Sequence, residues 1–184
     1  SLAIPLADTT SLEIGATIGI PALTAYAGMF KYSKLNGSTI LITGGAGSVG
    51  NCAIQMAKYA GAHVISSVSG QEKMTAALNA GADHVLRYDT SHFIKDVKDI
   101  TSGRKLDLIF DVAFGHNIET NLDIIKEHGI ISTYASDNKS IAEIPFQKFL
   151  QMNLSIYSVF MYLLEDKMMQ DAVQFITNWQ TDLG

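Results

Sequence analysis

Short apolar runs and longer amphipathic segments alternate along most of the chain. The runs are rich in β-branched and aromatic residues, which is typical of strands. They predict six strands, over residues 39–43, 63–68, 84–88, 106–112, 130–134 and 154–160. Between them, apolar residues recur at helical spacing, as Val49, Ala53 and Met56 do in the predicted helix 48–60. Strands that alternate with helices indicate a doubly wound α/β domain with a six-stranded parallel sheet and helices on both faces.

Glycine and capping residues set the predicted helix boundaries. Gly61 and Gly81 are expected to end helices 48–60 and 71–80, because glycine readily adopts the left-handed conformation found after a helix. The other helices are predicted after Ser91 as an N-cap, before Gly129 as a stop, and over 145–150 and 163–179.

The N-terminal part is expected to be a helical lead-in, residues 1–36, to a single domain that spans 1–184. A short helix is predicted over 12–18 and a second over 22–34. Residues 19–21 (GIP) are expected to separate them, because proline removes a backbone donor and clashes with the preceding helical turn.

A glycine cluster, residues 44–50 (GGAGSVG), joins the strand 39–43 to the next helix. Gly45 is expected to permit the tight turn, Gly47 to let a pyrophosphate approach the backbone, and Gly50 to let the helix lie close to the strand. A strand, a glycine turn and a helix in this order predict a dinucleotide-binding loop, although an unrelated α/β protein can carry a similar turn. This predicts the strand order 3-2-1-4-5-6, with the ligand at the carboxyl ends of the strands. The candidate cofactor-binding residues here are Gly45, Ala46, Gly47, Ser48, Val49 and Gly50.

Composition excludes several other classes of function. The net charge is -5, and no cluster of lysine and arginine marks a nucleic-acid interface. The single cysteine, Cys52, excludes an internal disulfide and a cysteine-rich metal site, and we expect it to pack in the core. The uncharged stretch 14–30 contains Pro21 and several glycines, so we expect buried helix and no membrane span. A chain that begins at Ser1 without a basic segment reads as a piece of a longer, cytoplasmic protein.

Three segments together resemble a known family: 19–26 (GIPALTAY), 44–50 (GGAGSVG) and 80–85 (AGADHV). In this order and spacing they are similar to the cofactor domain of medium-chain dehydrogenases/reductases, and to the zinc-independent quinone oxidoreductases (NADPH:quinone reductase, zeta-crystallin-like) in particular. The resemblance implies a GroES-like catalytic domain, built from sequence before and after this chain and missing from it. It also implies a homodimer through the edge strand 154–160, unless the last helix covers that edge.

The end of the second strand bears on the choice of nicotinamide cofactor. Sites that prefer NAD usually carry an acid there, and Ser69 stands at that position. A hydroxyl tolerates a 2′-phosphate that a carboxylate would repel, and Lys73 can supply a positive charge. By resemblance, Lys73 and Tyr88 match the family's lysine and tyrosine at the 2′-phosphate, so we expect NADPH. The alternatives are a solvated surface lysine and a packed tyrosine.

The nicotinamide end rests mainly on strand ends. Val112 and Phe114 follow the fourth strand, and Tyr134 and Ser136 the fifth, where ribose and nicotinamide contacts belong. By resemblance Thr24 lies near the nicotinamide, although its hydroxyl can instead bond within its own helix. Asp111 is expected to form local hydrogen bonds, and His116 to have a helix-start or surface role. Ile20 stands where zinc-dependent relatives place a cysteine ligand, so no metal site is expected.

These features favour an NADPH-dependent oxidoreductase that transfers hydride to a quinone or another activated carbonyl without zinc. A 2-alkenal or enoyl double-bond reductase shares this domain, and a non-catalytic nucleotide-binding scaffold is an alternative of another class. A short-chain dehydrogenase is disfavoured, because no Tyr-x-x-x-Lys pair follows the fourth strand. No catalytic residue is assigned. We expect a small-molecule acceptor as the partner and an isolated domain that is inactive.

Overall fold

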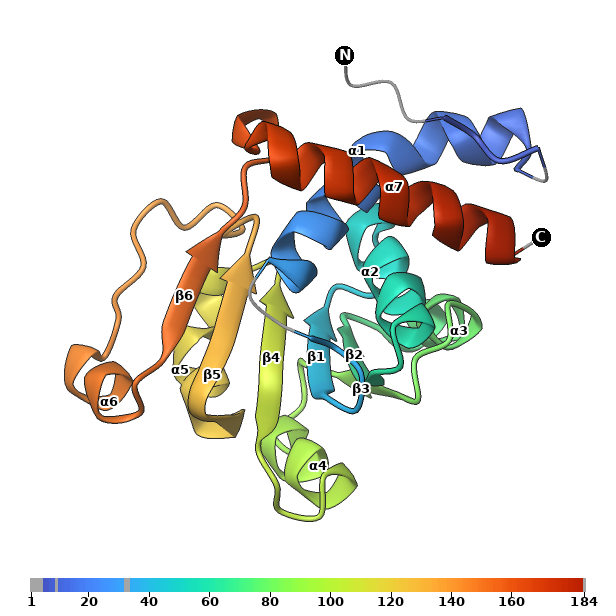
Figure 1. The fold of residues 1–184 in the computed structure, drawn as a ribbon. Coiled ribbons are helices and arrows are strands. Elements are labelled where there is room, and N and C mark those ends of the chain that lie inside the picture. The colour runs from blue at the N-terminus through green and yellow to red at the C-terminus, as the bar shows by residue number, and fades with distance from the viewer. Residues whose placement is uncertain (1–4, 9, 32–33, 184) are drawn as a thin grey trace.

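Six parallel strands form one sheet in a computed structural model, which describes residues 5–8, 10–31 and 34–183. The strand order is β3-β2-β1-β4-β5-β6, as the glycine loop predicts, and every neighbouring pair is parallel (Figure 1). The predicted doubly wound α/β fold is therefore confirmed. The strands are β1 Thr39–Thr43, β2 His63–Val68, β3 His84–Arg87, β4 Leu106–Asp111, β5 Ile125–Thr133 and β6 Ser155–Ser158.

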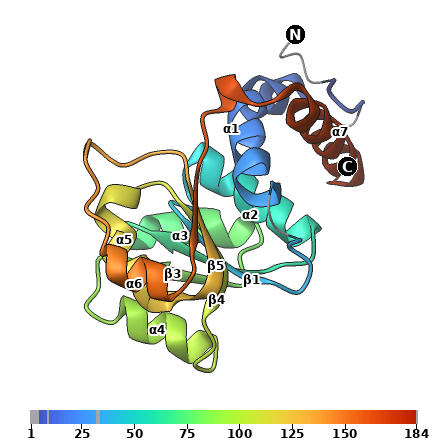
Figure 2. The ribbon, with the colours of Figure 1, turned by 60° about the vertical axis from the view of Figure 1, so that its left-hand side comes forward.

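Helices cover both faces of this sheet (Figure 2). One face carries the first three helices, α1 Leu12–Phe30, α2 Ser48–Tyr59 and α3 Gln71–Asn79. The other carries α4 Phe93–Ile100, α5 Phe114–Ile124 and α6 Phe146–Gln151. A short 3-10 turn, η1 Met161–Leu163, leads into α7 Asp166–Leu183, which packs against α1 (Figure 1).

The strands divide the core into two halves because successive side chains point to opposite faces of a sheet. In β1, Ile40 and Ile42 face α1 and α2, whereas Leu41 between them faces α4 and α5. All three are completely buried. Burial on both faces explains why these strands appear as unbroken apolar runs in the sequence.

The predicted break in the N-terminal helix is wrong, because α1 continues through Pro21. Proline in a helix interior costs about 3 kcal/mol. Beyond it, Ala22, Ala25 and Ala27 are completely buried, so packing supplies the compensation. The helix ends at Phe30 rather than at residue 34, and residues 32–33 of the predicted helix lie outside the described residues.

Several other boundaries differ from prediction. β5 begins at Ile125, well before Gly129, because Ile125 pairs with Leu106 of β4 ahead of a register shift. The N-cap of α4 is His92 rather than Ser91. β6 is shorter than the predicted 154–160, and Tyr88 and Val112 each lie just beyond the strand that was expected to contain them.

Candidate functional site

The turn between β1 and α2 is held by the neighbouring strand. The backbone N–H groups of Gly44 and Gly45 both donate to the carbonyl of Ser67 in β2, at 2.9 and 3.2 Å. Gly44 has a φ of +69°, so it adopts the left-handed conformation that favours glycine. The reason predicted for Gly45 is therefore wrong, since Gly44 makes the tight turn. Gly45 is required for space instead, because a β-carbon there would collide with the Ser66 hydroxyl.

The start of α2 lies directly against this turn. A β-carbon on Gly50 would collide with the carbonyl of Gly44, so only glycine permits this approach of helix to strand. At Gly47 the nearest atom, the Gly44 oxygen, would be 3.3 Å from a β-carbon, so the described protein atoms do not by themselves require glycine. Gly47 lines a cleft, which leaves its predicted role beside a pyrophosphate as a prediction.

A cleft of about 1140 Å³ opens at the carboxyl ends of β1, β2, β4 and β5. It exceeds the roughly 300–1,000 Å³ of most small-molecule sites, which suits an extended ligand. Many of the predicted residues line this one cleft, namely Ala46, Gly47, Ser48, Val49, Ser69, Lys73, Tyr88, Val112 and Tyr134. The fold therefore brings predicted residues that are far apart in the sequence together at the edge of the sheet where the strand order reverses.

Three other predicted residues, Thr24, Phe114 and Ser136, do not line the cleft. Thr24 is buried in α1, and its hydroxyl donates to the Ile20 carbonyl at 2.8 Å, within its own helix. Phe114, the first residue of α5, is buried in the core between this helix and the sheet. The Ser136 hydroxyl accepts a hydrogen bond from the N–H of Gly115 at 3.1 Å. The backbone N–H of Phe114 donates to the Ala135 carbonyl at 3.2 Å, so two hydrogen bonds join the loop after β5 to the start of α5.

The β2 end of the cleft is exposed and charged. The Lys73 ammonium donates to the Ser69 hydroxyl at 2.7 Å, so the two residues expected at a 2′-phosphate lie in contact. Glu72, the residue before Lys73 in the sequence, also lines the cleft. Tyr88 lies at the same end and is about half exposed, at 52%.

The β4 end is buried and held by Asp111. This carboxylate is completely buried and accepts hydrogen bonds from the Thr43 hydroxyl at 3.0 Å and from the Ala113 N–H at 2.9 Å. The side-chain amides of Asn117 and Asn121 donate to it at 2.8 and 2.6 Å. Asp111 therefore forms local hydrogen bonds, as expected, and ties β4 to β1 and α5.

Tyr134 closes the β5 side of the cleft. Its ring packs on Phe110 with centroids 4.9 Å apart. Burial, followed by the negative charge of Asp111, raises the pKa of the Tyr134 hydroxyl. The phenol consequently stays protonated through the physiological range.

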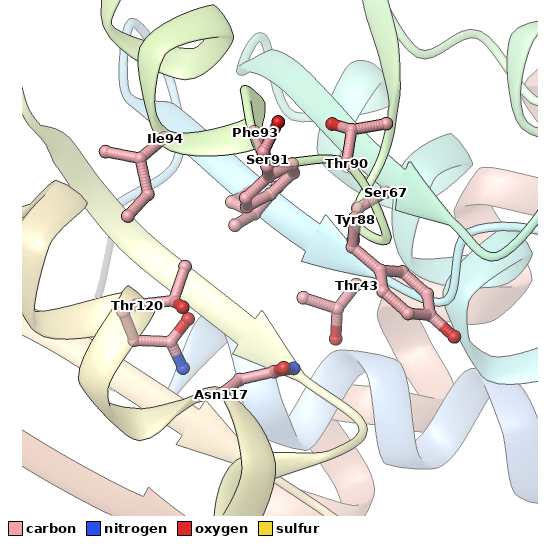
Figure 3. Close-up of a pocket in the computed structure, with 11 residues that line it drawn as sticks. Thr43, Ser67, Tyr88, Thr90, Ser91, Phe93, Ile94, Asn117 and Thr120 are labelled. Carbon is pink, nitrogen blue, oxygen red and sulfur yellow. The ribbon is translucent and has the colours of Figure 1, made fainter.

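A smaller pocket of about 150 Å³ adjoins the cleft and shares Thr43, Tyr88 and Asn117 with it. Figure 3 shows Asn117 and Thr120 of α5 facing Ser91 and Phe93 across this pocket. Its inner wall contains Ser67, whose hydroxyl has no hydrogen-bond partner among the described residues. The sequence reasoning missed these groups, although hydroxyl residues after β3 and amides at helical spacing on α5 were visible signals.

Other candidate groups have local roles. Burial raises the pKa of the Cys52 thiol to about 11, so it remains a neutral core group. His116 is exposed, and its Nε2 lies 3.0 Å from the Asp137 carbonyl. Across the described ranges, no three His, Cys, Asp or Glu side chains gather closely enough to hold a metal. In the same part of the chain, none of the helices has the length and apolar character needed to cross a membrane.

Comparison with known proteins identifies the family. Residues 48–178 match the family described as zinc-binding dehydrogenase. The chain is 31% identical over 132 residues to a quinone oxidoreductase of Salmonella typhimurium, covering 71% of this chain and 40% of that relative. It is 32% identical over 98 residues to a 2-haloacrylate reductase of a Burkholderia species, covering 53% and 29%.

A solved structure supports the same assignment. The quinone oxidoreductase of Thermus thermophilus, whose structures include a complex with NADPH, superposes with a TM-score of 0.83 at 25% identity. The match covers 95% of this chain and 56% of that one, and the chain spans less than half the length of the curated relatives described above. The chain therefore belongs to the zinc-binding dehydrogenase family, and within the medium-chain dehydrogenase/reductase superfamily it is similar to the cofactor-binding domain of the quinone oxidoreductases.

Proposed function

We propose that this chain is the NADPH-binding part of an oxidoreductase that transfers hydride to a quinone or another activated carbonyl without zinc. The observation that carries the proposal is one continuous cleft with the glycine turn at its centre and the Lys73–Ser69 pair at its β2 end. The quinone oxidoreductases among its relatives support the reaction class.

The residues of the cleft fit such a cofactor in three places. Ala46 and Ser48 offer backbone donors to a pyrophosphate, and the start of α2 offers the positive end of a helix dipole, whereas the Gly47 N–H donates to the Gly44 carbonyl at 2.9 Å. Lys73 offers a charge-assisted hydrogen bond to a 2′-phosphate, and the neighbouring hydroxyl of Ser69 does not repel it. Tyr134 is left for the nicotinamide end, where its neutral ring can pack against a flat heterocycle.

In this assignment the chain binds, orients and shields the reacting groups. A reduced nicotinamide supplies the hydride when it is bound. The buried network of Asp111 fixes the wall between β1 and β4, and the Phe110–Tyr134 contact fixes the wall beside β5. We assign no proton donor to this chain.

The proposal excludes zinc because of the residue at one position. Ile20 replaces the cysteine ligand that the resemblance places there, and its aliphatic side chain cannot coordinate metal. It lies in α1 and is about half exposed, at 51%. Turnover by the full-length protein should therefore survive dialysis against a strong chelator, and a proportional loss of activity with zinc would contradict this part.

A second acceptor class is favoured by one relative. The similarity to a 2-haloacrylate reductase supports reduction of an activated carbon–carbon double bond as the alternative chemistry. Both reactions need an electron-poor acceptor. Product analysis with a quinone and with an α,β-unsaturated carbonyl, using full-length protein, would separate the two.

We also propose a homodimer through the edge of the sheet. β6 is the last strand in the order and pairs with β5 on its inner side, and an edge strand is a place where a second copy of a chain can extend a sheet. Figure 1 shows α7 running across α1 rather than along this edge. Sedimentation analysis should give a dimer, and a proline at Ile156, within β6, should weaken it because proline cannot donate to a neighbouring strand.

The first experiment is a titration of this chain with NADPH and, separately, with NADH, followed by nicotinamide fluorescence or heat. NADPH should bind at least about tenfold tighter, because Lys73 adds a charge-assisted hydrogen bond. Lys73→Ala should remove most of that difference. Failure of both cofactors to bind would favour the scaffold alternative and would have to be repeated with full-length protein.

A further inference from the structure

Lys73 and Glu72 line the β2 end of the cleft, and Arg87 and Asp89 are the sequence neighbours of Tyr88, which also lines it. Lys73 contacts Ser69, and Arg87 pairs with Asp89 through hydrogen bonds of 3.0 and 2.6 Å. Glu72 is the remaining acid, and its charge acts on Arg87. The formal charges of these four groups cancel, although a site that binds only a 2′-phosphate would be expected to carry excess positive charge.

The absence of a side chain at Gly70 leaves space that the Glu72 carboxylate occupies. The carboxylate oxygens of Glu72 lie where a β-carbon on Gly70 would be, so the acid folds back over the backbone that joins β2 to α3. The φ of Gly70 is −166°, an extended conformation that any residue adopts, so glycine serves here to provide space. The carboxylate therefore lies against Gly70, the residue after Ser69, and lines the cleft with Ser69 and Lys73 near the strand end where NAD-binding sites of this fold carry an acid.

A carboxylate in this place acts oppositely on the two nicotinamide cofactors. It accepts hydrogen bonds from ribose hydroxyls, which favours NADH. It repels a 2′-phosphate, which disfavours NADPH. Lys73 has the reverse preference, and both side chains line the same cleft.

We infer that Glu72 is a specificity-determining residue that substitutes for the missing acid at the end of β2 and narrows the preference for NADPH set by Lys73. The inference rests on the proposed function, because it concerns the same cofactor site. It implies a chain that binds both cofactors, with the ratio of affinities set by the balance between residues 72 and 73. The ordinary role of an acid in the first turn of a helix is to stabilise that helix, which would affect both cofactors equally.

The test measures dissociation constants for NADPH and NADH on the 184-residue chain and on Glu72→Gln. Glutamine keeps the shape and removes the charge, so the preference for NADPH should rise about tenfold, with NADPH binding tighter and NADH weaker. High salt should reduce the change, because exposed charges are screened. Because both cofactors are titrated into the same preparation, any loss of folded protein cancels in the ratio.

Asp96→Asn is the matched control, since Asp96 is the acid in the first turn of α4 and does not line the cleft. It should leave the ratio of affinities unchanged. The inference is overturned if Glu72→Gln changes both affinities by the same factor, or changes their ratio less than about twofold. If NADPH binds and Lys73→Ala weakens it while Glu72→Gln has no effect, this inference alone fails. If neither cofactor binds this chain or the full-length protein, the proposed function fails with it.

Discussion

At the β2 end of the cleft, Ser69, Glu72 and Lys73 are exposed, whereas at the β4 end Asp111 is completely buried and accepts hydrogen bonds from β1, α5 and its own loop. Exposed charges act mainly on what enters the cleft, because water screens their effect on folding. A buried carboxylate acts mainly on folding, because its partners lose their hydrogen bonds when it is removed. Substitutions at the two ends should therefore separate ligand selectivity from stability.

Asp111→Ala should have the largest effect. It leaves the buried side-chain amide of Asn121 without its acceptor, removes the acceptor of the 3.0 Å bond from the Thr43 hydroxyl, and should lower the free energy of unfolding by about 3–5 kcal/mol. Urea denaturation measures the change. Glu119→Ala, an exposed acid on the same helix as Asn121, should stay within about 0.5 kcal/mol. Equal changes in the free energy of unfolding would show that burial does not set the contribution of Asp111 to stability.

Gly50→Ala tests the turn between the two ends. The added methyl group collides with the Gly44 carbonyl, so we expect a loss of about 1–3 kcal/mol and weaker cofactor binding. Gly19→Ala in α1 is the matched helical glycine, because a methyl group there would meet no atom of the described residues within 4 Å. It should stabilise the chain by roughly 0.5–1 kcal/mol. Thermal melts of both variants would show whether space, rather than helix propensity, governs position 50.

Lys73→Ala should change binding with little change in stability. We expect the affinity for NADPH to fall about tenfold and that for NADH to stay within about twofold. The melting temperature should match that of the unmodified chain, because Lys73 is exposed. A large loss of stability would mean that the Lys73–Ser69 contact serves folding, contrary to the expectation that exposed residues at the β2 end affect ligand selectivity alone.

Tyr134→Phe should have the smallest effect at neutral pH, because the ring contact with Phe110 remains. The pKa of Tyr134 is raised in the folded chain, so its contribution to stability is present below the unfolded value of about 10 and is lost as pH rises through the folded value. Above pH of about 10, the unmodified chain should lose stability faster than Tyr134→Phe. Urea denaturation between neutral and alkaline pH measures this difference, and parallel curves would contradict the assigned burial.

The apolar runs predict the strands and the glycine turn after the first strand predicts their order, because both are local signals. The helix break predicted at Pro21 is wrong, because the burial of the alanines that follow is a tertiary effect that no local pattern contains. The spacing of the glycine motif assigns the tight turn to Gly45, because spacing alone does not show that Gly44 has the positive φ.

Much of the cleft lining was predictable, because residues of the glycine turn and of the strand ends line it in this fold. Lys73 could be identified from its distance to the glycine loop, and it does line the cleft. The amides that hold Asp111 come from two successive turns of α5, and a fold is needed to bring them to a strand end. The place of the Glu72 carboxylate is not predictable from residue type, because it depends on the space that Gly70 leaves open.

The bonds from Gly44 and Gly45 to the Ser67 carbonyl have a dynamic consequence. They make the glycine turn an extension of the sheet, so its amide protons should exchange slowly with solvent despite the local glycine content. The conformational entropy of ordering this turn is then lost during folding rather than during ligand association. The turn should keep one shape with and without a nucleotide, and adjustment to a ligand should occur in the exposed side chains around it.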